Sequence, residues 1–243
     1  MRIPRIYTTS ALSCDTLVDL DENSSRHLIS VLRMSAGQAV LLFNGQGGEY
    51  SGELTNVQKN RVSVSISTFI DCNRESPLKI HLAIGVSRGD RMDWVIQKAT
   101  ELGVTAITPL FTERTEVKLN AERLEKKTRH WQHIAIGACE QCQRTLVPHV
   151  SLAIPLEQWV VTDNHSLKLV LHHRTDKRLG EFCATNDLVS LLVGPEGGLS
   201  DSEIDFALNN GFDPLTLGPR VLRTETAPLA AISILQSLWG DMG

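Results

Sequence analysis

Two short apolar runs in the last third of the chain each end in the dipeptide Gly-Pro. The run Leu188–Val193 is followed by Gly-Pro-Glu-Gly-Gly at residues 194–198, and the run Leu215–Leu217 is followed by Gly-Pro at residues 218–219. Each run has the composition of a buried strand that stops in a tight turn and then leads into a helix. Two such strand ends side by side are typical of α/β sheets that bind a ligand at this edge. The sequence therefore predicts an α/β fold with a site at these two turns.

Strand and helix patterns alternate through the region that contains these runs. Residues 78–84 predict a strand, and residues 104–110 predict the next strand. Between them, one face of a helix is marked by Met92, Val95, Ile96, Ala99 and Leu102. Together these elements indicate a βαβ unit with a parallel sheet. Further predicted elements are a helix over 121–142, a strand over 167–171, a helix opened by the capping box Ser200–Glu203 and ended by Gly211, and a nearly all-apolar helix over 226–239 with Pro228 in its first turn.

The first seventy residues have a different character, because short β patterns dominate them. Residues 39–43 precede the hairpin signal Asn-Gly at 44–45, and residues 61–67 alternate apolar and polar side chains. A short helix is expected near Ser24–Leu32, capped by Ser24 or Ser25. Because the segment 71–77 is polar and ends in proline, we place a linker there and predict a small barrel over residues 1–72 and an α/β domain over residues 73–243.

Charge and composition narrow the classes of function. The 243-residue chain has a net charge of −4, which argues against a protein that coats nucleic acid through bulk electrostatics. It has no apolar stretch long enough to span a bilayer, and its first residues lack the apolar core of a signal peptide, so a cytoplasmic protein is expected. Five cysteines do not suggest a disulfide framework, and Cys139 and Cys142 read as helix residues one turn apart.

Several nucleotide, hydrolase and metal motifs are absent from the sequence. There is no Gly-x-Gly-x-x-Gly after a strand, no phosphate-binding P-loop, no Gly-x-Ser-x-Gly and no His-Glu-x-x-His. The histidines show no metal-ligand spacing, so no metal is predicted; they include residues 81, 130, 133, 149, 165, 172 and 173.

The segment 217–227, Leu-Gly-Pro-Arg-Val-Leu-Arg-Thr-Glu-Thr-Ala, together with the turn 194–198, resembles the signature of the ribosomal RNA small subunit methyltransferase E family, which belongs to the SPOUT (trefoil-knot) methyltransferases. The resemblance covers the whole chain, since further motifs occur in the expected order; they lie at residues 2–7, 27–33, 87–92, 97–103 and 138–141. The chain departs from the family pattern at Gln143, where glycine is common, and at His173, where proline is common.

The resemblance implies an N-terminal PUA-like β-barrel that contacts RNA and a C-terminal domain whose end is threaded into a trefoil knot. It also implies that S-adenosylmethionine binds in the knot, that a homodimer completes the site, and that the reaction methylates N3 of one uridine in 16S ribosomal RNA of the small subunit. The implied cofactor-binding residues are Leu171, His172, Gly194, Glu196, Gly197, Gly198, Leu217, Gly218, Leu222, Thr226 and Ala227.

Methylation of N3 requires that the N3 proton leave, and an arginine near O2 or O4 would stabilise the developing anion. Arg223 is the first candidate for this role and Arg220 the second, although either arginine could instead pair with Glu225. Glu225 or a water molecule is the candidate proton acceptor, because arginine stays protonated. The candidate RNA-binding residues are Arg2, Arg5, Arg33, Arg88, Arg91, Gln141 and Arg144, with Gln97 and Glu140 also considered on the RNA side of the site.

Two other functions remain open from the sequence. One is an RNA-binding or ribosome-assembly protein with a vestigial cofactor pocket, against which the intact segments 194–198 and 217–227 argue. The other is a methyltransferase of the same fold that acts on a transfer RNA or on another ribosomal site.

Overall fold

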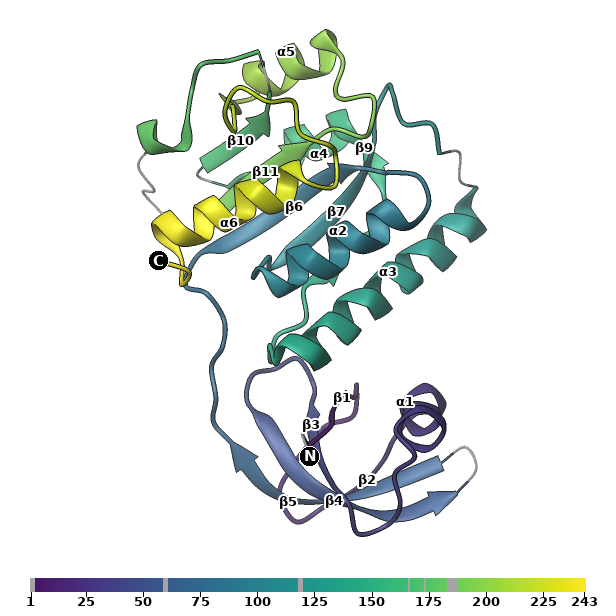
Figure 1. Ribbon diagram of the computed structural model, residues 1–243. Coiled ribbons are helices and arrows are strands. Elements are labelled where there is room, and N and C mark those ends of the chain that lie inside the picture. The colour runs from purple at the N-terminus through teal and green to yellow at the C-terminus, as the bar shows by residue number, and fades with distance from the viewer. Residues whose placement is uncertain (1–2, 59–60, 118–119, 166, 173, 183–187) are drawn as a thin grey trace. The chain divides into compact units, whose positions relative to one another are not determined.

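The chain forms two compact units in a computed structural model that describes residues 3–58, 61–117, 120–165, 167–172, 174–182 and 188–243. The first unit comprises residues 1–75 together with 139–147, and the second comprises 76–138 together with 148–243. The predicted boundary after residue 72 falls just before the end of the first of these stretches. Figure 1 shows the elements of both units along the chain.

The first unit is built on a five-stranded sheet with the order β1-β3-β4-β5-β2. Its strands are β1 (Arg5–Tyr7), β2 (Leu17–Asp19), β3 (Ala39–Phe43), β4 (Glu49–Gln58) and β5 (Arg61–Ile70). Strands β3 and β4 are antiparallel neighbours, which confirms the hairpin predicted at Asn44-Gly45. The alternating residues of β5 bury one face, where Val62, Val64 and Ile66 join the core of this unit.

The short helical segment of this unit differs from the prediction in its cap and in its geometry. Helix α1 (Glu22–Arg26) is capped by Asp21, whose carboxylate accepts hydrogen bonds from two backbone N–H groups, and it continues as the π-helical turn η1 (His27–Val31). The expected caps were wrong. The Ser25 hydroxyl is buried and joins the helix to the sheet instead, because it donates to Leu20 O at 3.2 Å and accepts from Val62 N at 3.0 Å.

Buried charges bind residues 139–147 into the first unit. Arg5 pairs with Glu49 at 2.8 Å and donates to Cys139 O at 2.7 Å and Arg144 O at 3.2 Å. Arg144 in turn pairs with Glu75 at 2.6 Å. The side chains of Arg5 and Arg144 are only 3% and 5% exposed, so their guanidinium groups are not accessible to RNA phosphates. In this structure both side chains make contacts within the unit, and their role as RNA-binding residues stays a prediction.

The second unit contains a parallel sheet with the order β12-β10-β11-β6-β7-β8, and β9 also pairs with β7. Its strands are β6 (Lys79–Gly85), β7 (Ala106–Phe111), β8 (His149–Val150), β9 (Ile154–Pro155), β10 (Leu167–Leu171), β11 (Leu188–Val193) and β12 (Asp213–Leu215). The described helices are α2 (Asp90–Glu101), α3 (Ala121–Cys142), α4 (Leu156–Thr162), the 3-10 turn η2 (Leu179–Glu181), α5 (Asp201–Asn209) and α6 (Ala227–Trp239).

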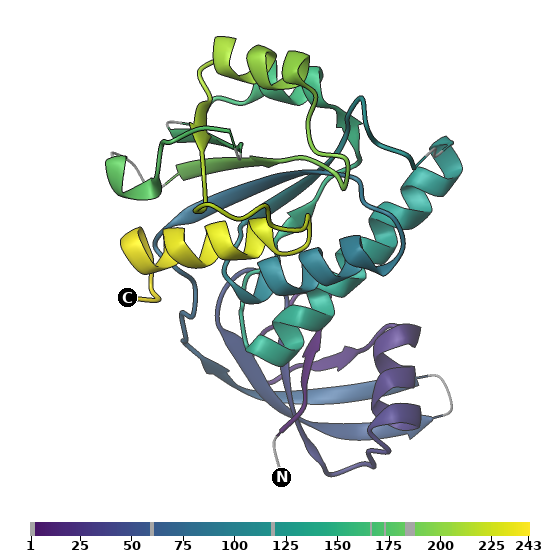
Figure 2. The same ribbon diagram turned by 45° about the horizontal axis from the view of Figure 1, so that its top comes forward.

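Helices cover both faces of this sheet. Figure 2 shows α2 and α6 together on one face and α4 and α5 on the opposite face. The core under α4 and α5 includes Ala83, Val170 and Leu192, which are register neighbours on β6, β10 and β11. A parallel sheet covered on both faces needs strands that are apolar on both sides, which the runs over 188–193 and 78–84 supply.

Most element predictions for this unit are confirmed, including the βαβ unit of β6, α2 and β7, the capping box at Ser200 and the Cys-x-x-Cys at the end of α3. A hydrogen bond with Cys142 and burial raise the pKa of the Cys139 thiol, which makes it unreactive.

Two details differ. The last strand ends at Leu215 instead of Leu217, and β12 and β11 flank β10 instead of lying next to each other. The predicted knot stays a prediction. Among the described helices, none is long and apolar enough to cross a membrane.

Candidate functional site

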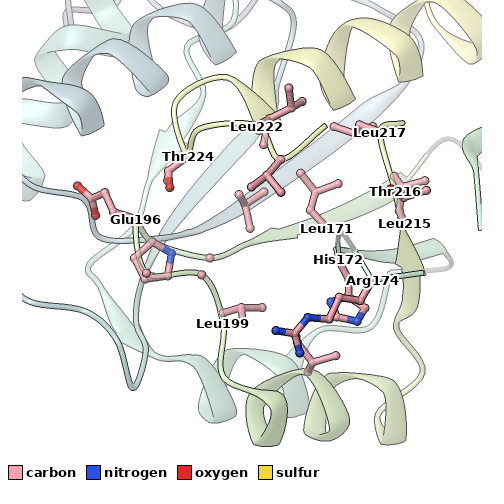
Figure 3. Close-up of a pocket in the computed structure, with 18 of the residues that line it drawn as sticks. Leu171, His172, Arg174, Glu196, Leu199, Leu215, Thr216, Leu217, Leu222 and Thr224 are labelled. Atoms are coloured by element: carbon pink, nitrogen blue, oxygen red, sulfur yellow. The ribbon is translucent and has the colours of Figure 1, made fainter. Parts of the chain in front are cut away.

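A cavity of about 310 Å³ opens at the carboxyl ends of β10, β11 and β12 (Figure 3). Three segments supply most of its lining: the end of β10 at Leu171 and His172, the turn 194–199 after β11, and the loop that follows β12. Because these strands are parallel, their carboxyl ends meet at one edge of the sheet. The cavity therefore lies at the edge of the sheet where the sequence predicts a ligand site.

The turn after β11 is shaped by its glycines. The N–H of Gly198 donates to Pro195 O at 2.8 Å, and Gly198 has φ +69°, a conformation that L side chains rarely adopt. A Cβ on Gly194 would come within 2.7 Å of Leu199 N. Since side chains are excluded at these positions, the turn offers peptide groups to a ligand. One of its carbonyls, Gly197 O, accepts a hydrogen bond from Arg114 Nη1 at 2.8 Å.

Glu196 lines the rim of the cavity and is held from outside it. Its Oε1 accepts hydrogen bonds from the backbone N–H of Arg88 at 2.9 Å and from the Arg91 guanidinium at 3.0 Å. Partial burial acts to raise the pKa of the carboxyl, but these hydrogen bonds outweigh it and lower the pKa below its ordinary value. Glu196 is therefore a carboxylate at neutral pH, and it ties the N-terminal end of α2 to the turn.

The loop from β12 to α6 forms the third wall. Leu217 and Leu222 present apolar side chains to the cavity, with Thr216 and Thr224 beside them (Figure 3). The loop closes onto α6 because the N–H groups of Thr226 and Ala227 both donate to Arg223 O at 2.9 Å. An apolar wall next to exposed peptide groups suits a ligand with a flat apolar ring and polar edges.

The structure brings most of the predicted cofactor residues together. Those that line the cavity are Leu171, His172, Gly194, Glu196, Gly197, Gly198, Leu217, Leu222 and Ala227. Gly218 and Thr226 lie on the same loop but outside the described lining residues. Whether any of these residues contacts a cofactor stays a prediction.

The candidate catalytic residues all lie on the loop before α6, with different exposure. Arg220 and Arg223 are both exposed and Glu225 is half-buried. Of the three, only Arg220 is among the described residues that line the cavity. In the described part of the chain, no ion pair joins Glu225 to either arginine. The alternative of a simple Arg–Glu pair therefore gains no support from this conformation.

Sequence reasoning missed several residues of the cavity. Arg114 lies three residues after the end of β7, at the same edge of the sheet, so the rule used for the Gly-Pro turns could have found it. Arg174 and Asp201 line the opposite side and approach each other at 3.5 Å. They had no sequence signal, because the loop after β10 and the start of α5 meet only in the folded sheet.

The remaining RNA-binding candidates differ in their surroundings and in their ion pairs. Arg2 and the family departure His173 lie outside the described residues. Arg33 is exposed and has φ +54°, two residues after the end of the π-helical turn. Arg88 is exposed and forms an ion pair with Glu116 at 2.7 Å, and Arg91 forms an ion pair with Glu196 at 3.0 Å. Gln141 is exposed on α3. An RNA role for these four residues stays a prediction.

Comparisons with known proteins extend over the whole chain. Residues 74–236 match the RNA methyltransferase domain family, and residues 20–67 match the RNA methyltransferase PUA domain family. Ribosomal RNA small subunit methyltransferase E of Buchnera aphidicola is 36% identical over 99% of this chain and 98% of its own length. The chain belongs to the ribosomal RNA small subunit methyltransferase E family.

Solved structures support this membership. A methyltransferase from Legionella pneumophila, solved with the bound cofactor S-adenosylmethionine, is 45% identical with a TM-score of 0.97 and covers 99% of this chain and all of its own. The ribosomal RNA small subunit methyltransferase E of Neisseria gonorrhoeae, solved with S-adenosylmethionine, is 41% identical with a TM-score of 0.95 over both full chains. The PUA-like first domain and the methyltransferase second domain are thereby confirmed.

Proposed function

We propose that this protein uses S-adenosylmethionine to methylate N3 of one uridine in 16S ribosomal RNA of the small ribosomal subunit. The observation that carries the proposal is the cavity at the carboxyl ends of β10, β11 and β12, in a chain that shares its fold with two relatives solved with this cofactor. The uridine and its N3 are what the family resemblance implies. The alternative of a vestigial pocket is disfavoured, because the turn and the loop form an open cavity.

The cavity fits S-adenosylmethionine by its size and chemistry. Its volume of about 310 Å³ lies at the lower end of ordinary ligand pockets. Leu171, Leu217 and Leu222 would pack against the adenine ring, and the peptide groups of residues 194–198 would bind its polar edge. The Glu196 carboxylate is engaged by Arg88 and Arg91, so we assign it to holding the turn instead of contacting the cofactor directly. Bound there, the cofactor supplies the electrophilic methyl group.

The protein's own task is to handle the N3 proton and the charge on the base. N3 of neutral uridine carries a proton, which must leave before the nitrogen lone pair can form the new bond to carbon. The exposed Arg223 guanidinium, beside the cavity, would donate to O2 or O4 of the base and stabilise its developing negative charge. Glu225 or a water molecule would accept the proton. A stabilising donor of this kind is worth about 10²–10³ in turnover.

The variant Arg223→Ala tests this role, with Arg223→Lys as its matched control. We expect Arg223→Ala to bind S-adenosylmethionine within twofold of the parent by calorimetry and to lose about 10²-fold or more in kcat. Arg223→Lys keeps the positive charge and is expected to recover part of that loss. Full turnover in a folded Arg223→Ala protein would remove this residue from the mechanism.

Transfer of a labelled methyl group to small ribosomal subunits tests the function as a whole. The subunits come from cells that lack this protein, and mass spectrometry of the nucleosides identifies the product. N3-methyluridine in the 16S ribosomal RNA would establish the reaction and the substrate together. Label in transfer RNA alone would overturn the substrate, and no transfer to any RNA would favour the binding-protein alternative. The same assay with naked 16S ribosomal RNA shows whether the assembled subunit is needed.

We also propose that the protein is cytoplasmic and that it forms a homodimer, the second of which the family resemblance implies. Helix α6 leaves Ile234 and Leu238 39% and 51% exposed although the opposite side of the helix is buried. Apolar side chains of this size on one helix face favour a protein partner. Sedimentation at assay concentration is expected to show a dimer, and an active monomer would refute the dimer.

A further inference from the structure

A row of polar side chains crosses the sheet of the second unit where an apolar layer is expected. Lys168 on β10, Ser190 on β11 and His81 on β6 are register neighbours. Side chains alternate along a strand, so this row points to the same face as the core row two residues further along each strand. That face is covered by α4 and α5. Polar groups on such a face cost free energy unless they are partnered.

The end of α4 brings two further ligand-bearing side chains to this row. Asp163 and His165 lie beside His81, and one ligand atom from each of the three residues lies within 4.8 Å of the other two. His165 Nδ1 is hydrogen-bonded to Asp163 Oδ1, which also accepts from Ser190 Oγ at 2.9 Å. His81 Nε2 lies 2.8 Å from Thr108 Oγ1. The cluster is therefore compact, with Asp163 buried and the two histidines half-buried.

Only one of the two carboxylate oxygens of Asp163 has hydrogen-bond partners among the described residues. Its side chain is 1% exposed, and its Oδ2 has no hydrogen-bond partner within the described residues. A buried carboxylate oxygen without a partner costs about 1–3 kcal/mol or more. Two imidazoles and one such carboxylate are a common ligand set for zinc.

We propose that His81, Asp163 and His165 bind one divalent cation of the zinc class. Ligand atoms on a tetrahedral Zn²⁺ lie about 2.0–2.2 Å from the ion, so the three side chains need only small rotations to close on it. A water molecule would complete the coordination. The Lys168 ammonium borders the cluster and donates to the backbone carbonyl of Asp163 at 2.5 Å.

The proposed site is distinct from the methyltransferase cavity. His81 and Ser190 lie in the first half of their strands, whereas the cavity opens beyond the carboxyl ends. A bound ion would join the segment after α4 to β6. Its role would be to stabilise this face of the sheet, because ions that bind only the folded state raise its stability. The proposal does not depend on the reaction or on the RNA substrate.

Co²⁺ and Zn²⁺ titrations of the untagged, chelator-treated full-length protein test the site. Co²⁺ in a site with imidazole and carboxylate ligands gives a visible absorption band, and Zn²⁺ is expected to abolish it at one equivalent and to raise the melting temperature. His165→Gln is the first variant, because its side chain is 23% exposed and the change is tolerated sterically. It is expected to weaken Zn²⁺ binding at least 100-fold, as is His81→Gln. His149→Gln, which changes an exposed histidine on β8, is the control and is expected to bind as the parent does.

Circular dichroism and S-adenosylmethionine binding verify that the variants are folded. Absence of saturable Zn²⁺ binding to the parent at micromolar concentration would overturn the proposal and leave a hydrogen-bond network. So would parent-like binding in folded His165→Gln, or loss of binding in His149→Gln, since either result places the ion elsewhere. Failure of methyl transfer with Zn²⁺ binding intact would count against the proposed function alone.

Discussion

Substitution of Gly194 by alanine tests whether the turn after β11 builds the cofactor pocket. The added Cβ would lie 2.7 Å from Leu199 N and 2.8 Å from Gly198 C. Both are backbone atoms, and non-bonded carbon contacts are optimal at about 3.5–4.0 Å. The turn must therefore move by roughly 1 Å. Overpacking of this kind costs about 1–3 kcal/mol of folding free energy.

The same displacement should weaken the cofactor site. The turn binds through peptide groups whose directions are set by the hydrogen bond from Gly198 N to Pro195 O. Loss of one or two ligand hydrogen bonds at about 1 kcal/mol each corresponds to an affinity loss of about 5- to 30-fold. We expect calorimetry with S-adenosylmethionine to show this loss, and urea unfolding to show the lower stability.

Gly137→Ala is the matched control for this experiment. Gly137 lies on α3, is exposed, and would place its Cβ in open space. Alanine there should stabilise the helix by about 0.5–1 kcal/mol and leave cofactor affinity unchanged. If folded Gly194→Ala binds S-adenosylmethionine as tightly as the parent does, the close packing of this turn does not shape the site and the reasoning fails.

Three further predictions concern stability. The pKa of His81 is about 4 in the folded state and 6.5 in the unfolded state, so the unfolded state binds more protons between these two pH values. The unfolding free energy should therefore fall by up to about 3 kcal/mol when the pH is lowered from 7 to 4. The same pH dependence in His81→Gln would contradict this prediction. Glu75→Gln removes the carboxylate from the buried Arg144 and should cost about 3–5 kcal/mol by urea unfolding, whereas Glu53→Gln at an exposed position should cost almost nothing. Ser200→Ala removes the cap of α5 and should lower the unfolding free energy by about 1 kcal/mol; Ser200→Asp, which can also cap, should restore it.

Local sequence patterns were enough to predict the class of fold and the edge of the sheet at which the cavity opens. Strands β3, β10 and β11 and helix α3 begin and end where the apolar patterns predict, because periodicity and Gly/Pro turns act over neighbouring residues. The turn 194–198 and the loop after β12 were identified for the same reason. The family resemblance also came from contiguous motifs, and the comparisons confirmed it.

The contacts between side chains that are distant along the chain could not be predicted in this way. Arg5 and Arg144 have the sequence character of surface cations, but they are buried with Glu49 and Glu75. The pocket residues Arg174 and Asp201 had no local signal, and His81, Asp163 and His165 have no metal-ligand spacing along the chain. Strand order and register place such residues together, and these depend on which strands pair across long separations. Local patterns carry no information about that pairing, so the clusters appear only once the sheet has formed.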